Sequence, residues 1–403
     1  MEAAAGDPGQ ALALTVRLYG HVSARFGLGD GAAATRRILE ACGCAVHCHD
    51  LRLSTHPALD PLPPDEAPPP APLIDLVHTN PNVLAASPGL LDPAALTAPL
   101  RIGYWAWELE AFPDGWEPHF SSYDEIWCPS GACAQSLSQR SPVPVVAVPH
   151  LPDWPRLDAL RRQRRETAEP FRFLTLFDFW STPERKNPAG VIAAFQRAFP
   201  PGAGGEGPAV ELLIKSSSAE QFPRQRAALE ALAGGDPRVR WLDGLLSREE
   251  LDALFCSADA LVSLHRAEGF GLNLADAMAI GLPVIATGYS ANLEFMPPGS
   301  AVLVPWQPVT INQACGDYRA GLWWAEPDQA AAAEGMRRLV EQPAWAAALA
   351  ERGAAAVRER LSTERITAIV RERLVQALTQ PSRRELAAAL PLDHPARVLV
   401  SPQ

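Results

Sequence analysis

Short apolar runs alternate with amphipathic stretches along nearly all of the 403 residues of this chain. A short apolar run bounded by turn residues predicts a buried strand, and apolar positions spaced by 3.6 residues predict a helix. Their alternation is typical of an α/β protein with parallel sheets. In the first half we expect strands at residues 12–19, 46–51, 73–78, 101–105, 125–128 and 143–148, and a helix at 31–41.

The same alternation begins again near the middle of the chain. Expected strands in the second half are 171–177, 210–214, 238–242, 260–264, 283–286 and 301–304. Expected helices are 188–198, 247–257, 272–280 and 330–341, followed by an almost continuous helical region from 345 to about 378. A chain of this length exceeds what one core usually organises, so two domains are expected.

Two proline-containing segments interrupt the alternation. Residues 57–72 are too rich in proline for a helix or a central strand, so we expect an exposed loop there. Residues 152–170 are charged and flanked by prolines, which is typical of a linker. The resulting prediction is a first domain at 1–152, a linker at 153–170, a second domain at 171–378, and a tail at 379–403 that can pack on the first domain.

Composition excludes some classes of protein. Apolar residues make up 47% of the chain and charged residues 20%, as in ordinary globular enzymes. The net charge of −11 disfavours a nucleic-acid partner, which needs a basic face. The N-terminal residues show no signal-peptide pattern, and the seven cysteines are scattered. We therefore expect a cytoplasmic protein with at most peripheral membrane contact.

The most informative stretch runs from Glu268 to Asp276, between the strand at 260–264 and the helix that follows it. Gly269 and Gly271 let backbone approach a ligand closely. The first helical turn offers unpaired N–H groups and a positive dipole end to an anion. Two carboxylates that flank an anion site suit a nucleotide sugar, which has hydroxyls on both sides of its diphosphate. The alternative is an ordinary glycine-rich turn between a strand and a helix.

The run 263–287 resembles the Glu-x7-Glu signature of the retaining glycosyltransferase family 4, with Asp276 in place of the second glutamate. The resemblance is strong over 171–338, and the segment 103–110 is similar to a bacterial subset that builds surface polysaccharides. It implies the GT-B fold, in which two Rossmann-like α/β domains face each other across a cleft. It also implies that Glu268 lies at the reacting sugar and Asp276 at the ribose. The implied donor-binding residues of this stretch are Gly269, Phe270, Gly271, Leu272 and Asp276.

A basic pair follows the first strand of the second half. Residues 181–188 resemble the family's phosphate-binding segment, so Arg185 and Lys186 are expected to neutralise the donor diphosphate. We rank Lys186 first, as a catalytic residue. Positive charge is unfavourable at the start of a helix, which favours a functional pair over a solvated one. Lys215 ends a predicted strand and is equally compatible with a nucleotide contact and with simple exposure.

The first half carries weaker candidates. Gly27 and Gly29 lie in a turn that resembles a dinucleotide-binding loop, although glycines there also serve packing. Trp105 and Trp107 could stack on an acceptor sugar, and Glu108 could orient its hydroxyl as a third catalytic residue beside Glu268 and Lys186. Burial of these tryptophans in the core is the alternative.

No metal or cofactor is expected. The sequence between Cys42 and His49 is rich in cysteine and histidine, but it runs from a helix into a strand without the paired spacing of a zinc site. There is no Asp-x-Asp motif, which argues against a metal-dependent glycosyltransferase.

The sequence thus predicts a retaining hexosyltransferase that uses a GDP-, dTDP- or UDP-linked hexose or deoxyhexose. The acceptor would be a saccharide or another hydroxyl, in bacterial polysaccharide or glycoconjugate synthesis. A nucleotide-sugar 2-epimerase of the same fold and a non-catalytic sugar-binding module remain alternatives.

Overall fold

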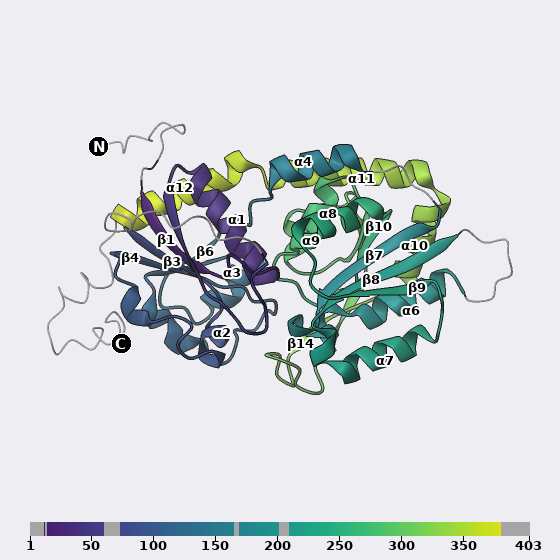
Figure 1. Cartoon of the computed structure of the whole chain (residues 1–403), viewed down its shortest axis with the longest axis horizontal. Helices are drawn as coiled ribbons and strands as arrows, with labels where there is room; N and C mark the ends of the chain where they lie inside the picture. Colours follow the sequence, from purple (N-terminus) through teal and green to yellow (C-terminus); the bar gives the residue numbers. More distant parts are fainter. Residues whose placement is uncertain (1–11, 13, 60–72, 165–168, 201–208, 380–403) are drawn as a thin grey trace. The chain divides into compact units, whose positions relative to one another are not determined.

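A computed structural model describes residues 12, 14–59, 73–164, 169–200 and 209–379 (Figure 1). The tail at 379–403 and the proline-rich loop at 57–72 lie almost wholly outside the described residues. The chain forms two compact units. Unit 1 contains the described residues up to Leu151 and those from Leu361, and unit 2 contains those from Pro152 to Arg360.

Unit 1 is built on a six-stranded sheet of order β2-β1-β3-β4-β5-β6, in which every pair is parallel. The apolar runs of the sequence form these strands because both faces of the sheet are covered, and β3 and β5 are buried at every position. The six strands expected in this half are therefore confirmed. They are β1 (Thr15–Gly20), β2 (Ala45–Asp50), β3 (Ile74–His78), β4 (Leu100–Tyr104), β5 (Glu125–Cys128) and β6 (Val145–Ala147).

Unit 2 has a second six-stranded parallel sheet, of order β12-β11-β10-β7-β8-β9. Counted from its first strand, this is the doubly wound Rossmann order. The six strands expected in the second half are confirmed. They are β7 (Phe171–Asp178), β8 (Val210–Ser217), β9 (Val239–Asp243), β10 (Ala260–Ser263), β11 (Val284–Thr287) and β12 (Val302–Val304).

Helices cover the sheets of both units (Figure 1). Unit 1 contains α1 (Gly27–Ala41), α2 (Pro81–Ala86), α3 (Gly131–Ser138) and α12 (Thr363–Thr379), with 3-10 turns η1 (Pro93–Ala95) and η2 (Glu117–Ser122). Unit 2 contains α4 (Trp154–Gln163), α5 (Pro183–Lys186), α6 (Pro188–Ala198), α7 (Pro223–Ala233), α8 (Arg248–Ser257), α9 (Leu272–Ala279), α10 (Gln329–Glu341) and α11 (Pro343–Arg360), with η3 (Phe179–Ser181), η4 (Ala219–Gln221) and η5 (Ala291–Glu294). Among the described residues, no helix has the length and apolar character needed to cross a membrane.

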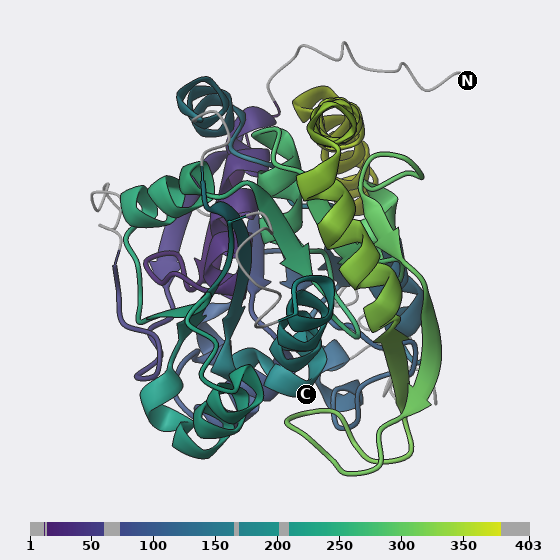
Figure 2. The same ribbon diagram turned by 90° about the vertical axis from the view of Figure 1, so that its right-hand side faces the viewer.

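An antiparallel hairpin of β13 (Trp306–Thr310) and β14 (Trp323–Pro327) forms a second, two-stranded sheet in unit 2 (Figure 2). The sequence pattern did not predict it. The rings of Trp306 and Trp323 both pack near Tyr289, at centroid distances of 4.6 and 5.7 Å. This aromatic contact fixes the hairpin to the loop that follows β11.

Helix α4 occupies much of the segment interpreted as a linker. Asp153 caps it by accepting a hydrogen bond from the Arg156 backbone N–H at 3.3 Å, and a proline lies in its first turn. Leu157 and Leu160 are buried. The charged, proline-flanked pattern therefore marks the beginning of an amphipathic helix of unit 2, and the linker prediction missed it.

The long helical region near the C-terminus is divided between the two units. Helix α11 belongs to unit 2, whereas α12, which we assigned to the second domain, belongs to unit 1 and packs on α1. Helix α12 buries Val370 and Leu374 completely. Its Arg373 Nε donates to Oε2 of the buried Glu125 at 2.8 Å. The apolar face of α12 thus completes the core of unit 1.

The contribution of α12 to the stability of unit 1 can be measured by truncating two adjacent side chains of this helix, one buried and one exposed. Leu374→Ala removes a side chain that is 0% exposed, whereas Val375→Ala truncates one that is 52% exposed. We expect Leu374→Ala to lower the free energy of unfolding by about 2–5 kcal/mol, because it leaves a cavity. Val375→Ala should change it by less than about 0.5 kcal/mol. Urea unfolding of both variants tests this, and equal effects would show that α12 is not part of the core.

Candidate active site

The centre of the unit 2 sheet is a topological switch point. Strands β7 and β10 pair with each other, and the chain continues from β7 toward β8 and from β10 toward β11, on opposite sides. In open α/β sheets, ligands bind at the carboxyl ends of the strands at such a point. The segments that leave β7 and β10 contain the two motifs singled out in the second half of the sequence.

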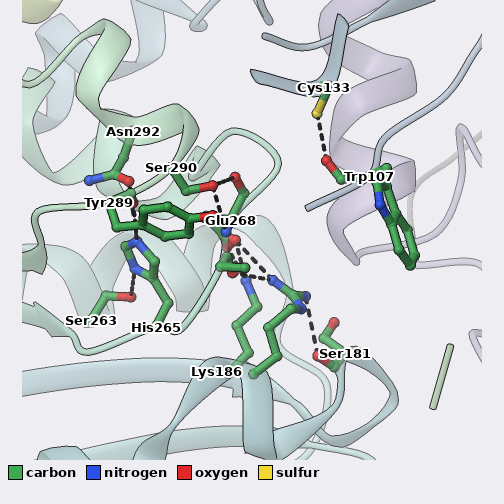
Figure 3. A network of polar contacts seen from close by, with 12 residues as sticks. Trp107, Cys133, Ser181, Lys186, Ser263, His265, Glu268, Tyr289, Ser290 and Asn292 are labelled. Atoms are coloured by element: carbon green, nitrogen blue, oxygen red, sulfur yellow. Dashed lines mark hydrogen bonds and ion pairs between the residues drawn. The ribbon is translucent and has the colours of Figure 1, made fainter. Parts of the chain in front are cut away.

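The structure brings Lys186 and Glu268 together at this point (Figure 3), and Arg185 contacts the same carboxylate. Lys186 Nζ contacts both carboxylate oxygens of Glu268 and lies 2.9 Å from Oε2. Arg185 Nη1 donates to Oε2 of the same carboxylate at 3.2 Å. Glu268 is only 8% exposed. Two cations therefore hold one buried carboxylate.

Backbone and amide hydrogen bonds join the α5 turn to the end of β10. Asn187 Nδ2 donates to Leu264 O at 2.9 Å, and the Arg266 N–H donates to Arg185 O at 2.7 Å. Arg185 Nη1 also donates to Ala267 O at 2.9 Å. Asn187 has a φ of 55°, in the left-handed region that asparagine tolerates well. Sequence reasoning missed Asn187, although an asparagine before a helix-starting proline is a signal for this kind of turn.

Ser290 fixes the backbone of Glu268 from the other side. Its hydroxyl donates to Glu268 O at 2.7 Å and accepts from the Glu268 N–H at 3.2 Å. The Ala291 N–H also donates to Glu268 O, at 3.4 Å. The loop after β11 thereby holds the catalytic candidate in place, and the sequence analysis did not identify this contact.

His265 is a buried neutral residue that supports the same loop (Figure 3). Its Nε2 lies 3.2 Å from Asn292 Oδ1 and 3.3 Å from Tyr289 O, which are both acceptors, so the proton is on Nε2. Its Nδ1 then accepts from the Ser263 hydroxyl at 3.0 Å. Burial lowers the pKa of His265 despite the nearby Glu268 carboxylate. It ties the loop after β11 to β10 and was also missed from the sequence.

Electrostatics keep Glu268 ionised. Burial acts to raise its pKa, but the charges of Lys186 and Arg185 outweigh burial and lower the pKa to about 2. Glu268 is therefore a permanent acceptor at neutral pH and not a proton donor. The two cations and one carboxylate leave a net positive charge, which suits a phosphate group.

The two cations have different surroundings. The Arg185 side chain is 5% exposed and lies over the Tyr318 ring at 5.9 Å, whereas the Lys186 side chain is 22% exposed. Lys186 is thus the more accessible cation. The chain contains only one other lysine, Lys215, a half-buried residue near the end of β8.

The glycine turn before α9 has the backbone that the motif predicted. Gly271 has a φ of +97°, and a Cβ there would lie 2.9 Å from Leu274 Cδ1. Phe270 is 6% exposed and packs on Phe295 at 5.2 Å, so its ring is a core anchor. Gly269 is also buried, and Leu272 begins the helix, partly exposed. These positions can offer backbone N–H groups to an anion at the amino end of α9.

Asp276 lies one turn further along α9 and forms an ion pair with Arg156 of α4. Arg156 Nη1 also lies 2.5 Å from Asp252 Oδ1 on α8. Arg156 could not be found as a site residue from the sequence, because its segment was interpreted as linker.

The glycine-rich turn of unit 1 is part of a helix. Helix α1 begins at Gly27, before the position that we expected. A Cβ at Gly29 would lie 2.0 Å from Ala24 O, whereas nothing lies within 4 Å of one at Gly27. Glycine at 29 is therefore required by the close packing of α1 on the preceding loop. Donor binding by Gly27 and Gly29 has no further support in the structure.

The tryptophans expected on the acceptor side lie in the core of unit 1. Trp105 is 0% exposed and Trp107 is 4% exposed. Trp105 packs edge-on against Trp116 at 5.7 Å, and Trp107 Nε1 donates to Ala111 O at 2.7 Å. Their rings are covered by protein, so the expected stacking on a sugar is not available. Glu108 is half-buried and follows Trp107 in the loop after β4.

Buried histidines lie at the carboxyl ends of the unit 1 strands, where the sequence analysis selected none. His78 ends β3 and stacks on Tyr104 at 4.1 Å, and the Tyr104 hydroxyl lies 3.3 Å from His150 Nδ1. A Cβ at Gly31 would lie 2.8 Å from His78 Nε2 and 3.0 Å from His150 Cε1. The absence of a side chain at Gly31 therefore makes room for both rings.

The cysteine-rich segment is structural in character. Cys42 and Cys44 are buried, and burial raises the pKa of their thiols to about 11 and about 12. His49 stacks on Tyr19 at 4.7 Å. Within the part of the chain that the structure describes, no group of three or more His, Cys, Asp or Glu residues could hold a metal ion.

Residues 192–342 match the family model described as "Glycosyl transferases group 1". No curated protein sequence matches the chain. Among solved structures, α,α-trehalose 6-phosphate synthase from Burkholderia multivorans is 14% identical, with a TM-score of 0.61 over 92% of this chain and 100% of that one. Sucrose-phosphate synthase from Thermosynechococcus elongatus is 18% identical, with a TM-score of 0.60 over 91% and 99%. HepE from Anabaena, solved with UDP and glucose, is 13% identical, with a TM-score of 0.58 over 90% and 100%.

These similarities establish the fold. The two six-stranded parallel sheets with their helices form the α/β architecture of GT-B glycosyltransferases. The matched family segment contains Glu268 and Asp276 and begins after Lys186.

The buried histidines of unit 1 predict sensitivity to acid. Burial lowers the pKa of His78 well below its usual range and that of His150 to about 3. The unfolded chain binds protons on both as the pH falls below about 6.5, whereas the folded chain does not. Their contribution to stability is thus complete above about pH 6.5 and is lost as the pH falls toward 3.

Urea unfolding at several pH values between 7 and 4 measures this effect. We expect the unfolding free energy to decrease with falling pH, and His150→Gln to make that decrease shallower. A His150→Gln variant with the same pH slope as the natural chain would contradict the assignment.

Proposed function

We propose that this protein is a retaining glycosyltransferase that moves a hexose or deoxyhexose from a nucleoside-diphosphate sugar to a saccharide or glycoconjugate hydroxyl. The observation that carries the proposal is the buried Glu268 carboxylate held by Lys186 and Arg185 at the switch point of unit 2. That arrangement offers positive charge for a diphosphate and a fixed acceptor for a sugar hydroxyl within one small region.

The chemistry of glycosyl transfer matches these groups. Breaking the anomeric bond leaves negative charge on the departing diphosphate and oxocarbenium-like charge on the sugar. Lys186 can stabilise the diphosphate as it leaves, with help from the amino end of α9. Glu268 has a pKa of about 2, so it stays charged and can accept a hydrogen bond from the sugar throughout the reaction.

The comparisons support the nucleotide-sugar donor. HepE was solved with UDP and glucose, and its fold is similar to that of this chain. The run 263–287 supports the retaining outcome through its similarity to the signature of a retaining family. Similarity of the segment 103–110 to polysaccharide-building enzymes supports a role in bacterial surface polysaccharide synthesis. We propose that the reaction takes place in the cytoplasm and needs no metal, because Lys186, Arg185 and α9 supply the positive charge.

A panel of nucleotides and nucleotide sugars tests the function. We expect one of UDP, GDP and dTDP to raise the melting temperature most, because a ligand that binds the native state stabilises it. The matching sugar donor should then be transferred with retention to a saccharide acceptor, and equally well in EDTA. Loss of activity in EDTA that manganese restores would contradict metal independence. Conversion of the donor to its 2-epimer without acceptor would identify an epimerase, and binding without turnover a sugar-binding module.

Variants of Lys186 and Glu268 test the site. Lys186→Ala should lower kcat about 10²-fold or more, since loss of one preorganised charge costs about 3 kcal/mol. Glu268→Gln should lower kcat with little change in donor affinity, because its contact matters most as the bond breaks. Arg240→Ala, at a side chain that is 63% exposed, is the control and should be neutral. Steady-state kinetics measure these effects. Near-natural activity of a folded Lys186→Ala protein would contradict the assignment of Lys186 to the site.

A further inference from the structure

Arg156 connects three helices of unit 2 through carboxylates. It lies in the first turn of α4, and its Nη1 contacts Asp252 Oδ1 of α8 at 2.5 Å. Its Nη2 contacts Asp276 Oδ2 of α9, and its Nε lies 4.0 Å from Asp153 Oδ2. The side chains of Arg156 and Asp276 are 19% and 22% exposed. One guanidinium therefore serves three acids in a mostly buried place.

Helix α4 is also attached to unit 2 by contacts that do not involve the Arg156 side chain. Leu157 and Leu160 are buried, and Arg161 Nη2 pairs with Glu351 of α11 at 2.6 Å. The α4 cap at Asp153 is intact without the guanidinium. A half-buried ion pair contributes little net stability, because desolvation offsets the attraction between its charges. The cluster around Arg156 is better explained by what it does to Asp276.

Arg156 determines which oxygen of the Asp276 carboxylate can accept a hydrogen bond from a ligand. Among the described residues, Arg156 is the only hydrogen-bond partner of that carboxylate, and it occupies Oδ2. A carboxylate accepts hydrogen bonds on both oxygens, so Oδ1 remains as an acceptor. Asp252 is held by the same guanidinium, so without Arg156 the two carboxylates would repel each other. Asp276 would then have neither a fixed orientation nor a neutralising partner.

We propose that Arg156 is a positioning residue for the donor ribose, which it orients by fixing Asp276 so that Oδ1 accepts a hydrogen bond from a ribose hydroxyl. This inference rests on the proposed function, which supplies the nucleoside-diphosphate donor.

The test compares a nucleoside diphosphate with its 2′,3′-dideoxy counterpart, which lacks both ribose hydroxyls. The nucleoside diphosphate is the one among UDP, GDP and dTDP that binds the natural chain best, with the 3′-deoxy form serving for dTDP. Binding of each pair is measured by calorimetry on the full chain. In the natural protein, removal of the ribose hydroxyls should weaken binding about tenfold, as expected for the loss of one hydrogen bond to a charged group.

Arg156→Met should reduce this discrimination to less than about threefold and leave binding of the deoxygenated nucleotide nearly unchanged. If Arg156 only supported folding, its loss would weaken the binding of both nucleotides equally. Arg156→Lys keeps the charge but replaces the planar fork, whose Nη1 and Nη2 contact the two carboxylates separately, with one ammonium group on a flexible stem. It should therefore lose most of the discrimination as well, and it provides the test if the methionine variant does not fold. The matched control is Arg161→Met. Arg161 lies on the same helix and pairs with the exposed Glu351, so this variant should keep the discrimination between the two nucleotides.

The outcomes separate the two proposals. Failure of the natural chain to bind any of the nucleotides overturns the proposed function together with this inference. If the natural chain distinguishes the two nucleotides and the Arg156 variants distinguish them equally well, the positioning role alone is overturned.

Discussion

The charge of Glu268 is the constraint on which the active-site region depends. A carboxylate removed from water is tolerated only next to cations and hydrogen-bond donors. Lys186 and Arg185 supply the charge, and this requires the segment after β7 to lie against the segment after β10. The Asn187 amide and the backbone bond between Arg266 and Arg185 hold these segments together. The geometry of the site is therefore a consequence of how one buried ion is stabilised.

Arginine and lysine have different tasks in this arrangement. The guanidinium of Arg185 has several N–H groups in a rigid plane, and it donates to Ala267 O, to Ser181 O and to Glu268. These hydrogen bonds within the protein hold the Arg185 side chain in place. Lys186 is a compact charge on a flexible stem and is the more exposed of the two, so it can shift toward an arriving phosphate while Arg185 keeps Glu268 in place.

Much of the fold could be predicted because parallel sheets buried on both faces leave continuous apolar runs in the sequence. Glu268, Lys186 and Arg185 were each selected from the sequence, but their direct contact was not predicted; it arises because parallel strands bring the carboxyl ends of β7 and β10 to one edge. The features that the sequence analysis missed depend on contacts with residues that are distant in the sequence. The proline and charges before Arg156 are typical of a linker unless one knows that α8 and α9 cover the resulting helix. Burial of Trp105 is decided by η2 and the residues around it, which local pattern does not reveal.

The return of α12 to unit 1 affects how the chain can fold as it is synthesised. Unit 2 is continuous in sequence, so all of its residues are available once Arg360 has emerged from the ribosome. Unit 1 lacks the partner of α1 and the cation that neutralises Glu125 until α12 has also emerged. Domains generally fold in order from the N-terminus during synthesis. Here the part of unit 1 that is translated first has to wait for α12, which follows all of unit 2 in the sequence, and its apolar α1 face stays uncovered until then.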